Sequence, residues 1–146
     1  NALYDSPVIL DYLDSVTPVG HLIPETTRPR IQVKRWEALA DGVLDAAIEI
    51  ELEKKRAPQL QSADWIARQS GKIERGLKVM SDELGDTAWC TGHSFNLSDI
   101  VVGCALMYLE FRFAEVNWRK DYPNLGQLTD KLAKRNSFKN TVPPAS

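Results

Sequence analysis

The strongest constraint on this chain is a helix start that runs directly into an apolar segment. Asn96 is a strong N-cap residue, and Asp99, three positions later, can accept a hydrogen bond from the Asn96 amide, as in a capping box. Residues 100–109 then carry no charge on any face. A helix that is apolar all round is typical of a protein core, and this one is too short to span a bilayer. The sequence therefore predicts a helical bundle around this buried central helix.

Two small residues of the central helix carry further expectations. Gly103 costs a helix about 1 kcal/mol relative to alanine, so it predicts the close approach of a neighbouring helix backbone. Cys104 is expected to be a buried free thiol that packs as a small hydrophobe. Cys90 is interpreted as a packed thiol of the preceding loop, and a nucleophilic role for it stays open. Unpaired cysteines favour a reducing, cytoplasmic location.

Capping and helix-breaking residues place the other helices. Ser6 as N-cap, with Pro7 at the first helical position, starts a short helix that ends near Asp14. Prolines and a glycine mark residues 15–27 as a linker. Further helices are predicted at about 28–56, 62–84 and 123–135, with a short final turn at 136–138. Because the sequence contains no alternating apolar pattern and no hairpin turn, its fold class is all-α.

Composition and motif content argue against several classes of function. The formal net charge of −2, with both signs mixed, gives no indication of nucleic acid or of a membrane surface as a partner. The sequence has no glycine-rich phosphate loop, no Cys-x-x-Cys pair and no zinc-ligand spacing, so no metal site is predicted. His21 and His93 stand alone on predicted loops. Taken by themselves, the residues indicate a helical bundle and do not indicate an enzyme.

A series of segments nevertheless follows a recognisable order along nearly the whole chain. They are Asp5-Ser6 before the short helix, the proline-containing linker, the long helix from Trp36 to Arg56, Trp89-Cys90-Thr91-Gly92, the capping box at 96–100 and Tyr122-Pro123-Asn124-Leu125. Their order resembles the glutathione S-transferase superfamily, and most of all its small bacterial members. The resemblance implies that residues 1–14 are the last helix of a thioredoxin-like domain that is otherwise missing. It also implies that residues 15–27 are a linker and residues 28–146 an all-α C-terminal domain.

The resemblance assigns glutathione-binding roles to three acidic or hydroxyl residues. Asp5 would contact the ammonium of the γ-glutamyl end, and Ser6, with the amides of a helix N-terminus, would hold its carboxylate. Without the resemblance, Ser6 is only a helix cap and Asp5 a solvated charge. Asp45 would reach the glutathione amine of a partner subunit, and the alternative of an exposed helix acid stays open.

The family's second substrate lies between the long helix and the end of the central helix. On that basis Trp36, Tyr108 and Arg112 are expected to line its pocket, although Trp36 also fits a stripe of core residues. The activating Ser, Cys or Tyr of the family belongs to the missing N-terminal segment, so the catalytic residue of this protein is not in the sequence and the fragment alone is expected to be inactive.

The function implied for the full-length protein is conjugation of glutathione, as a substrate, to hydrophobic small-molecule electrophiles by a homodimer. Two other functions within the superfamily stay open. One is a non-catalytic binding or regulatory module with the same fold. The other is a dehalogenase, isomerase or disulfide reductase that shares the helical domain.

Overall fold

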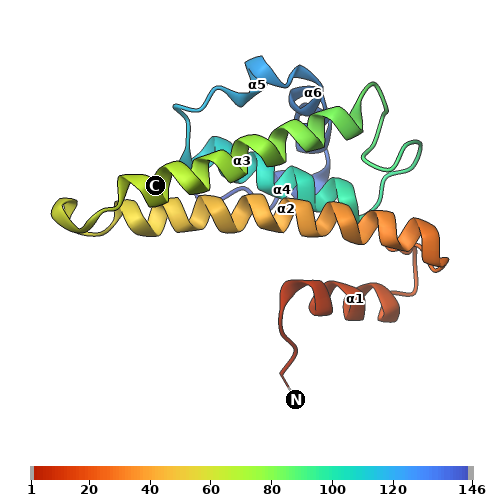
Figure 1. Cartoon of the computed structure of the whole chain (residues 1–146). Coiled ribbons are helices and arrows are strands. Elements are labelled where there is room, and N and C mark those ends of the chain that lie inside the picture. Colours follow the sequence, from red (N-terminus) through yellow and green to blue (C-terminus); the bar gives the residue numbers. More distant parts are fainter. Residues whose placement is uncertain (1, 145–146) are drawn as a thin grey trace.

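The computed structural model describes residues 2–144 of the chain (Figure 1). Its helices are α1 (Ser6–Val16), α2 (Thr27–Lys54), the 3-10 helix η1 (Pro58–Leu60), α3 (Ala63–Leu84), α4 (Leu97–Arg112), α5 (Trp118–Asp121), α6 (Pro123–Ala133) and α7 (Asn136–Lys139). Within residues 2–144 there is no β-strand, only an isolated bridge between Trp89 and Gly92. The all-α fold expected from the sequence is confirmed. No helix in this part of the chain is both long and apolar enough to cross a membrane.

The long helices α2 and α3 lie side by side, and α4 packs against α2 behind them (Figure 1). The turn between α2 and α3 is closed by polar contacts from both sides. The Gln61 amide donates to the carbonyl oxygens of Lys54 at 3.0 Å and Arg56 at 2.8 Å, which satisfies the end of α2. Ser62 caps α3, as expected, by accepting from the Trp65 amide at 3.2 Å.

The capping box predicted at the start of α4 is confirmed, and it is buried. Asn96 Oδ1 accepts from the Ser98 amide at 2.9 Å, and Asp99 Oδ2 accepts from the Asn96 amide at 2.9 Å. The second Asp99 oxygen accepts from the Cys90 amide at 2.8 Å. The Asp99 carboxylate therefore ties the preceding loop to the first turn of α4.

Gly103 is a position of close packing, but the neighbouring atoms differ from those expected. A Cβ added there would lie 2.6 Å from Leu132 Cδ1 and 3.0 Å from two ring carbons of Phe138. The space is thus filled by side chains of α6 and α7, whereas the sequence predicted a helix backbone. Gly76 of α3 plays the same part, since a Cβ there would overlap Val43 of α2.

The expectation that α4 is buried on every side is wrong. Cys104 is exposed, and Ile100, Met107, Tyr108 and Phe111 are only partly covered. These residues recur at intervals of three and four, so they share one face of the helix. The error arose because an uncharged helix can carry an apolar stripe that the described part of the chain does not cover.

The linker is folded back on the bundle. The Asp14 carboxylate, at the end of α1, accepts from the amides of Leu22 at 2.6 Å and Ile23 at 3.3 Å. The Leu22 carbonyl in turn accepts from the Leu97 amide at 3.0 Å, and the Ile23 side chain is buried. The linker thereby joins α1 to the start of the central helix.

Candidate functional site

The N-terminus of α1 is capped by Asp5. Asp5 has extended backbone angles (φ −97°, ψ −169°), and its carboxylate accepts from the Ser6 amide. The prediction that Ser6 is the N-cap is therefore wrong by one residue, because Asp5 supplies a capping side chain one position earlier. Ser6 is the first helical residue, and Pro7, without an amide hydrogen, fits the first turn just as well.

A chain of ion pairs joins α1 to the N-terminal half of α2, which lies directly above it in Figure 1. Asp11 contacts Arg30 Nη2 at 3.0 Å and Lys34 Nζ at 2.7 Å, and Lys34 Nζ also contacts Glu37 Oε2 at 2.8 Å. Burial lowers the pKa of Lys34, but its ion pairs with Asp11 and Glu37 outweigh that effect and raise the pKa overall. Lys34 is thus held as a cation between two carboxylates.

Beyond Lys34, the face of α2 that points to α1 is acidic. Burial raises the pKa of Asp41, and the negative charges of Glu37, Asp45 and Asp5 raise it further. Glu37 is 3% exposed, and its Oε1 has no hydrogen-bond partner among the described residues. The start of α1 and the middle of α2 together make a negative site that suits a cationic group.

Sequence reasoning missed Glu37 and Asp41. A signal was present, because Lys34, Glu37 and Asp41 lie three and four residues apart and so share one face of a helix. The role of Asp45 was predicted from the segment Asp41-Gly42-Val43-Leu44-Asp45, which contains Asp41 as well. Only the position of α1 shows that Asp41 is close enough for the charge of Asp5 to affect its pKa.

The other predicted site residues lie apart from one another. Asp45 is exposed and borders two shallow grooves on the outer side of α2 and α3, both of which also include Lys72. Trp36 is 3% exposed and lies beside a hollow lined by Cys90 and Thr91, close to the start of α4. It belongs to the buried core of the bundle as well.

Tyr108 and Arg112 lie at the other end of α4, in its last turns. Tyr108 is partly buried, and the Arg112 guanidinium is exposed, 4.5 Å from the centre of the Phe111 ring. The structure therefore brings these two close together but does not bring Trp36 to them.

Neither cysteine thiol is prepared for nucleophilic chemistry. Burial raises the pKa of the Cys90 thiol far above its usual range, and the neighbouring Asp99 carboxylate adds to the shift. Neighbouring groups also desolvate the Cys104 thiol in part and raise its pKa, although the residue is exposed. Both thiols are therefore protonated at neutral pH, and the interpretation of Cys90 as a packed loop thiol agrees with its buried position. Among residues 2–144, no group of His, Cys, Asp and Glu side chains is arranged to hold a metal ion.

Comparison with known proteins identifies the family. The family model of the glutathione S-transferase C-terminal domain matches residues 63–130. The chain is 36% identical over 141 residues to the GST-like protein YibF of Escherichia coli K12, an alignment that covers 97% of this chain and 69% of the relative. It is 24% identical to a probable glutathione S-transferase of Nicotiana tabacum, covering 93% of this chain and 64% of that protein.

Solved structures agree with the sequence comparison. A glutathione S-transferase of Methylobacillus flagellatus KT, crystallised with glutathione bound, has a TM-score of 0.94 and 49% identity, covering 97% of this chain and 70% of the other. One from Methylobacterium radiotolerans JCM 2831, in complex with glutathione sulfonate, has a TM-score of 0.93 and 40% identity, covering 99% and 68%. The chain thus spans about two thirds of the length of these relatives, and it belongs to the glutathione S-transferase family.

Proposed function

We propose that this chain is the helical part of a glutathione transferase that conjugates glutathione to hydrophobic electrophiles. The observation that carries the proposal is the likeness, at 49% identity and a TM-score of 0.94, to a transferase whose crystal structure contains glutathione. The two free cysteines of the described chain are consistent with a reducing, cytoplasmic compartment.

The γ-glutamyl end of glutathione would bind at the start of α1. The Ser6 hydroxyl, at the positive end of the α1 dipole, suits its carboxylate, as helix N-termini generally suit anions. Asp5 and Asp41 would face its ammonium, whose positive charge offsets the repulsion that raises the pKa of Asp41. In the homodimer that we propose for the full-length protein, the exposed Asp45 would contact the glutathione of the partner subunit.

The apolar stripe of α4 supports a hydrophobic second substrate. Tyr108 lies on it, next to Met107, and the exposed Arg112 stands at its end. A partly covered apolar face suits a hydrophobic ligand, since burying it releases ordered water. Trp36 is buried near the start of α4, so it does not belong to the pocket proposed at Tyr108 and Arg112.

The thiol of glutathione would be activated by a group outside this chain. Both cysteines of the chain have raised pKa values, so neither one supplies a thiolate or an activated partner at neutral pH. We therefore propose that the 146-residue chain by itself does not accelerate conjugation of glutathione to a chlorodinitrobenzene-type electrophile. Turnover that rises in proportion to the concentration of this chain would contradict this assignment.

Ser6→Ala in the full-length protein tests the glutathione site. A hydrogen bond to a charged group contributes about 1.5–3 kcal/mol, so the variant should raise the KM for glutathione about ten- to a hundredfold. Because Ser6 would contact the carboxylate far from the sulfur, kcat and the KM of the electrophile should change little. Since Asp5 is the helix cap, loss of the Ser6 hydroxyl should leave the stability of α1 nearly unchanged.

Ser15→Ala is the matched control at the other end of α1, where the hydroxyl donates to the Tyr12 carbonyl at 2.8 Å. It should leave the KM for glutathione as in the parent. An unchanged KM in Ser6→Ala would remove Ser6 from the site. A full-length protein that binds glutathione but conjugates it to none of a panel of electrophiles would instead favour the non-catalytic binding module.

A further inference from the structure

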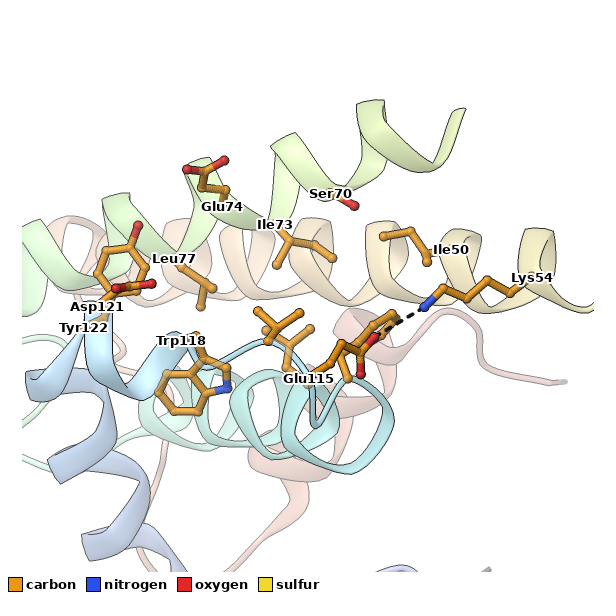
Figure 2. Close-up of a pocket in the computed structure, with 13 residues that line it drawn as sticks. Ile50, Lys54, Ser70, Ile73, Glu74, Leu77, Glu115, Trp118, Asp121 and Tyr122 are labelled. Atoms are coloured by element: carbon orange, nitrogen blue, oxygen red, sulfur yellow. Dashed lines mark hydrogen bonds and ion pairs between the residues drawn. The ribbon is translucent and has the colours of Figure 1, made fainter. Parts of the chain in front are cut away.

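A cavity of about 440 Å³ opens between the helices of the bundle (Figure 2). It lies between the C-terminal half of α2, the middle of α3, the end of α4 and the segment that leads into α5. Its floor consists of buried apolar side chains: Ile50, Ile73, Leu77, Leu109, Phe113 and Trp118. A cavity of this size with an apolar floor is within the range of small-molecule sites.

The rim of the cavity is charged unevenly. At one end Lys54 Nζ and Glu115 Oε1 lie 3.5 Å apart, so these two charges neutralise each other (Figure 2). At the other end Figure 2 shows Asp121 and the Tyr122 phenol together, with Glu74 on the adjoining turn of α3 and its carboxylate turned toward the outer side of that helix. Neither Glu74 nor Asp121 forms an ion pair within the described part of the chain. The cavity therefore has an apolar floor and an end with two carboxylates that are unpaired among residues 2–144, and Lys78, the cation near Tyr122, is itself paired with Asp82 at 2.6 Å.

This cavity is separate from the proposed glutathione site. Asp41, which faces α1, and Ile50, which lines the cavity, are nine residues apart on α2, and at 3.6 residues per turn they point to opposite sides of the helix. Lys54 lies a further turn away along the helix. A ligand in the cavity would thus not compete with glutathione for contacts.

We infer that the cavity binds an elongated hydrophobic amine. The apolar body of the ligand would lie over Ile73, Leu77 and Leu109, where its burial is favourable. The ammonium would lie at the end of the cavity that carries Asp121 and Glu74, beside the Tyr122 ring, whose face also attracts cations. A carboxylate ligand would meet repulsion at the same end, because the rim carries three acids and one lysine.

Three probes with the same body separate charge from hydrophobicity: 4-phenylbutylamine, 4-phenylbutan-1-ol and 4-phenylbutanoic acid. Titration of the 146-residue chain, followed by NMR or calorimetry, should give a Kd for the amine at least tenfold lower than for the alcohol, and the acid should bind more weakly still. Equal affinity for the three probes, or no binding of the amine, would overturn the inference.

Two variants assign the preference to this cavity. Glu74→Gln with Asp121→Asn should abolish the difference between amine and alcohol, and persistence of the difference would overturn the inference. Both residues are exposed, so the variant should keep its melting temperature. Ser70→Trp, on the exposed rim, should block all three probes.

The control is Glu25→Gln with Asp86→Asn, which removes two exposed carboxylates outside the cavity. It should retain the full preference for the amine. If the control lost as much of the preference for the amine as Glu74→Gln with Asp121→Asn does, the preference would come from the net charge of the protein, and the inference would be overturned.

Discussion

α1 and α4 begin with the same device, an Asp or Asn side chain that caps the first turn, yet the two helices are held in different ways. No residue of α1 is buried, and its apolar side chains Val8, Tyr12 and Leu13 are 48%, 52% and 51% exposed. In α4 the cap itself is in the core, where Ser98 and Asp99 are fully buried. One cap is at the surface and the other is surrounded by protein.

The difference decides what each polar contact contributes. Asp11 attaches α1 to α2 through its ion pairs with Arg30 and Lys34. The three side chains are between about one quarter and two fifths exposed, so solvent screens the charges. The Asp99 carboxylate accepts from two buried amides that have no access to water. Similar hydrogen bonds therefore stabilise α4 strongly and α1 weakly.

Asp99→Ala should have the largest effect. It leaves the amides of Cys90 and Asn96 buried without acceptors. It should lower the free energy of unfolding by about 2–6 kcal/mol, because each buried donor without an acceptor costs about 1–3 kcal/mol. Denaturant unfolding measures it. Asp11→Ala is the control from α1 and should cost at most about 1 kcal/mol.

The capping box is one reciprocal unit, which a double-mutant cycle can test. Asn96→Ala should cost about 0.5–2 kcal/mol through loss of the cap. The double variant with Asp99→Ala should cost less than the sum of the two single variants, because each one already disrupts the first turn. Strict additivity would show that the two side chains act independently. If Asp99→Ala cost no more stability than Asp11→Ala, the polar contacts of α4 would not be stronger than those of α1.

Gly103→Ala should have the next largest effect on stability. It should destabilise the protein, whereas its control should stabilise it. The added Cβ must displace Leu132 and Phe138, which costs about 1–3 kcal/mol, and the better helix propensity of alanine returns only about 1 kcal/mol. Gly42→Ala in α2 meets no atom within 4 Å, so it should raise the stability by about 0.5–1 kcal/mol. Thermal unfolding of both variants tests this prediction. Stabilisation by Gly103→Ala would mean that Leu132 of α6 and Phe138 of α7 can move aside without loss of stability.

Features that depend on neighbours in sequence could be predicted. The capping box at Asn96, the start of α3 at Ser62 and its end at Gly85 follow from local backbone chemistry, and the structure confirms them. The short helix α5 and the turn η1 were missed, because their few residues have no apolar period to detect. The exposure of Cys104 could not be predicted either, because it depends on which elements cover α4.

The candidate site shows the same limit. Asp5 and Ser6 were predicted from their place in a family pattern. That Asp5 lies near the acidic face of α2 could be learned only from the position of α1 in the structure. The amine cavity is lined from four separate segments, and no spacing in the sequence brings Glu74 and Asp121 together. Sites that one helix carries are within reach of sequence reasoning, and sites between helices are not.

Asp41→Asn should have the smallest effect on stability. It should raise the free energy of unfolding at neutral pH, whereas Asp99→Ala lowers it. Burial and the charges of Glu37, Asp45 and Asp5 raise the pKa of Asp41, so the folded protein binds this proton more tightly than the unfolded chain does. Stability therefore falls as the pH rises from the unfolded pKa, about 3.9, through the higher folded value. Above that window the ionised Asp41 destabilises the fold.

The amide of Asp41→Asn cannot ionise. At pH 7 the free energy of unfolding of the variant should therefore exceed that of the parent by up to about 0.5 kcal/mol, which is usual for a substitution at a partly exposed position. At pH 3, where the parent Asp41 is protonated in both states, the gain should vanish. Glu25→Gln, in the exposed linker, controls for the change in net charge and should show no such gain at pH 7. An equal gain at both pH values would mean that the amide packs better than the carboxyl, and the acidic face of α2 would then carry no electrostatic cost.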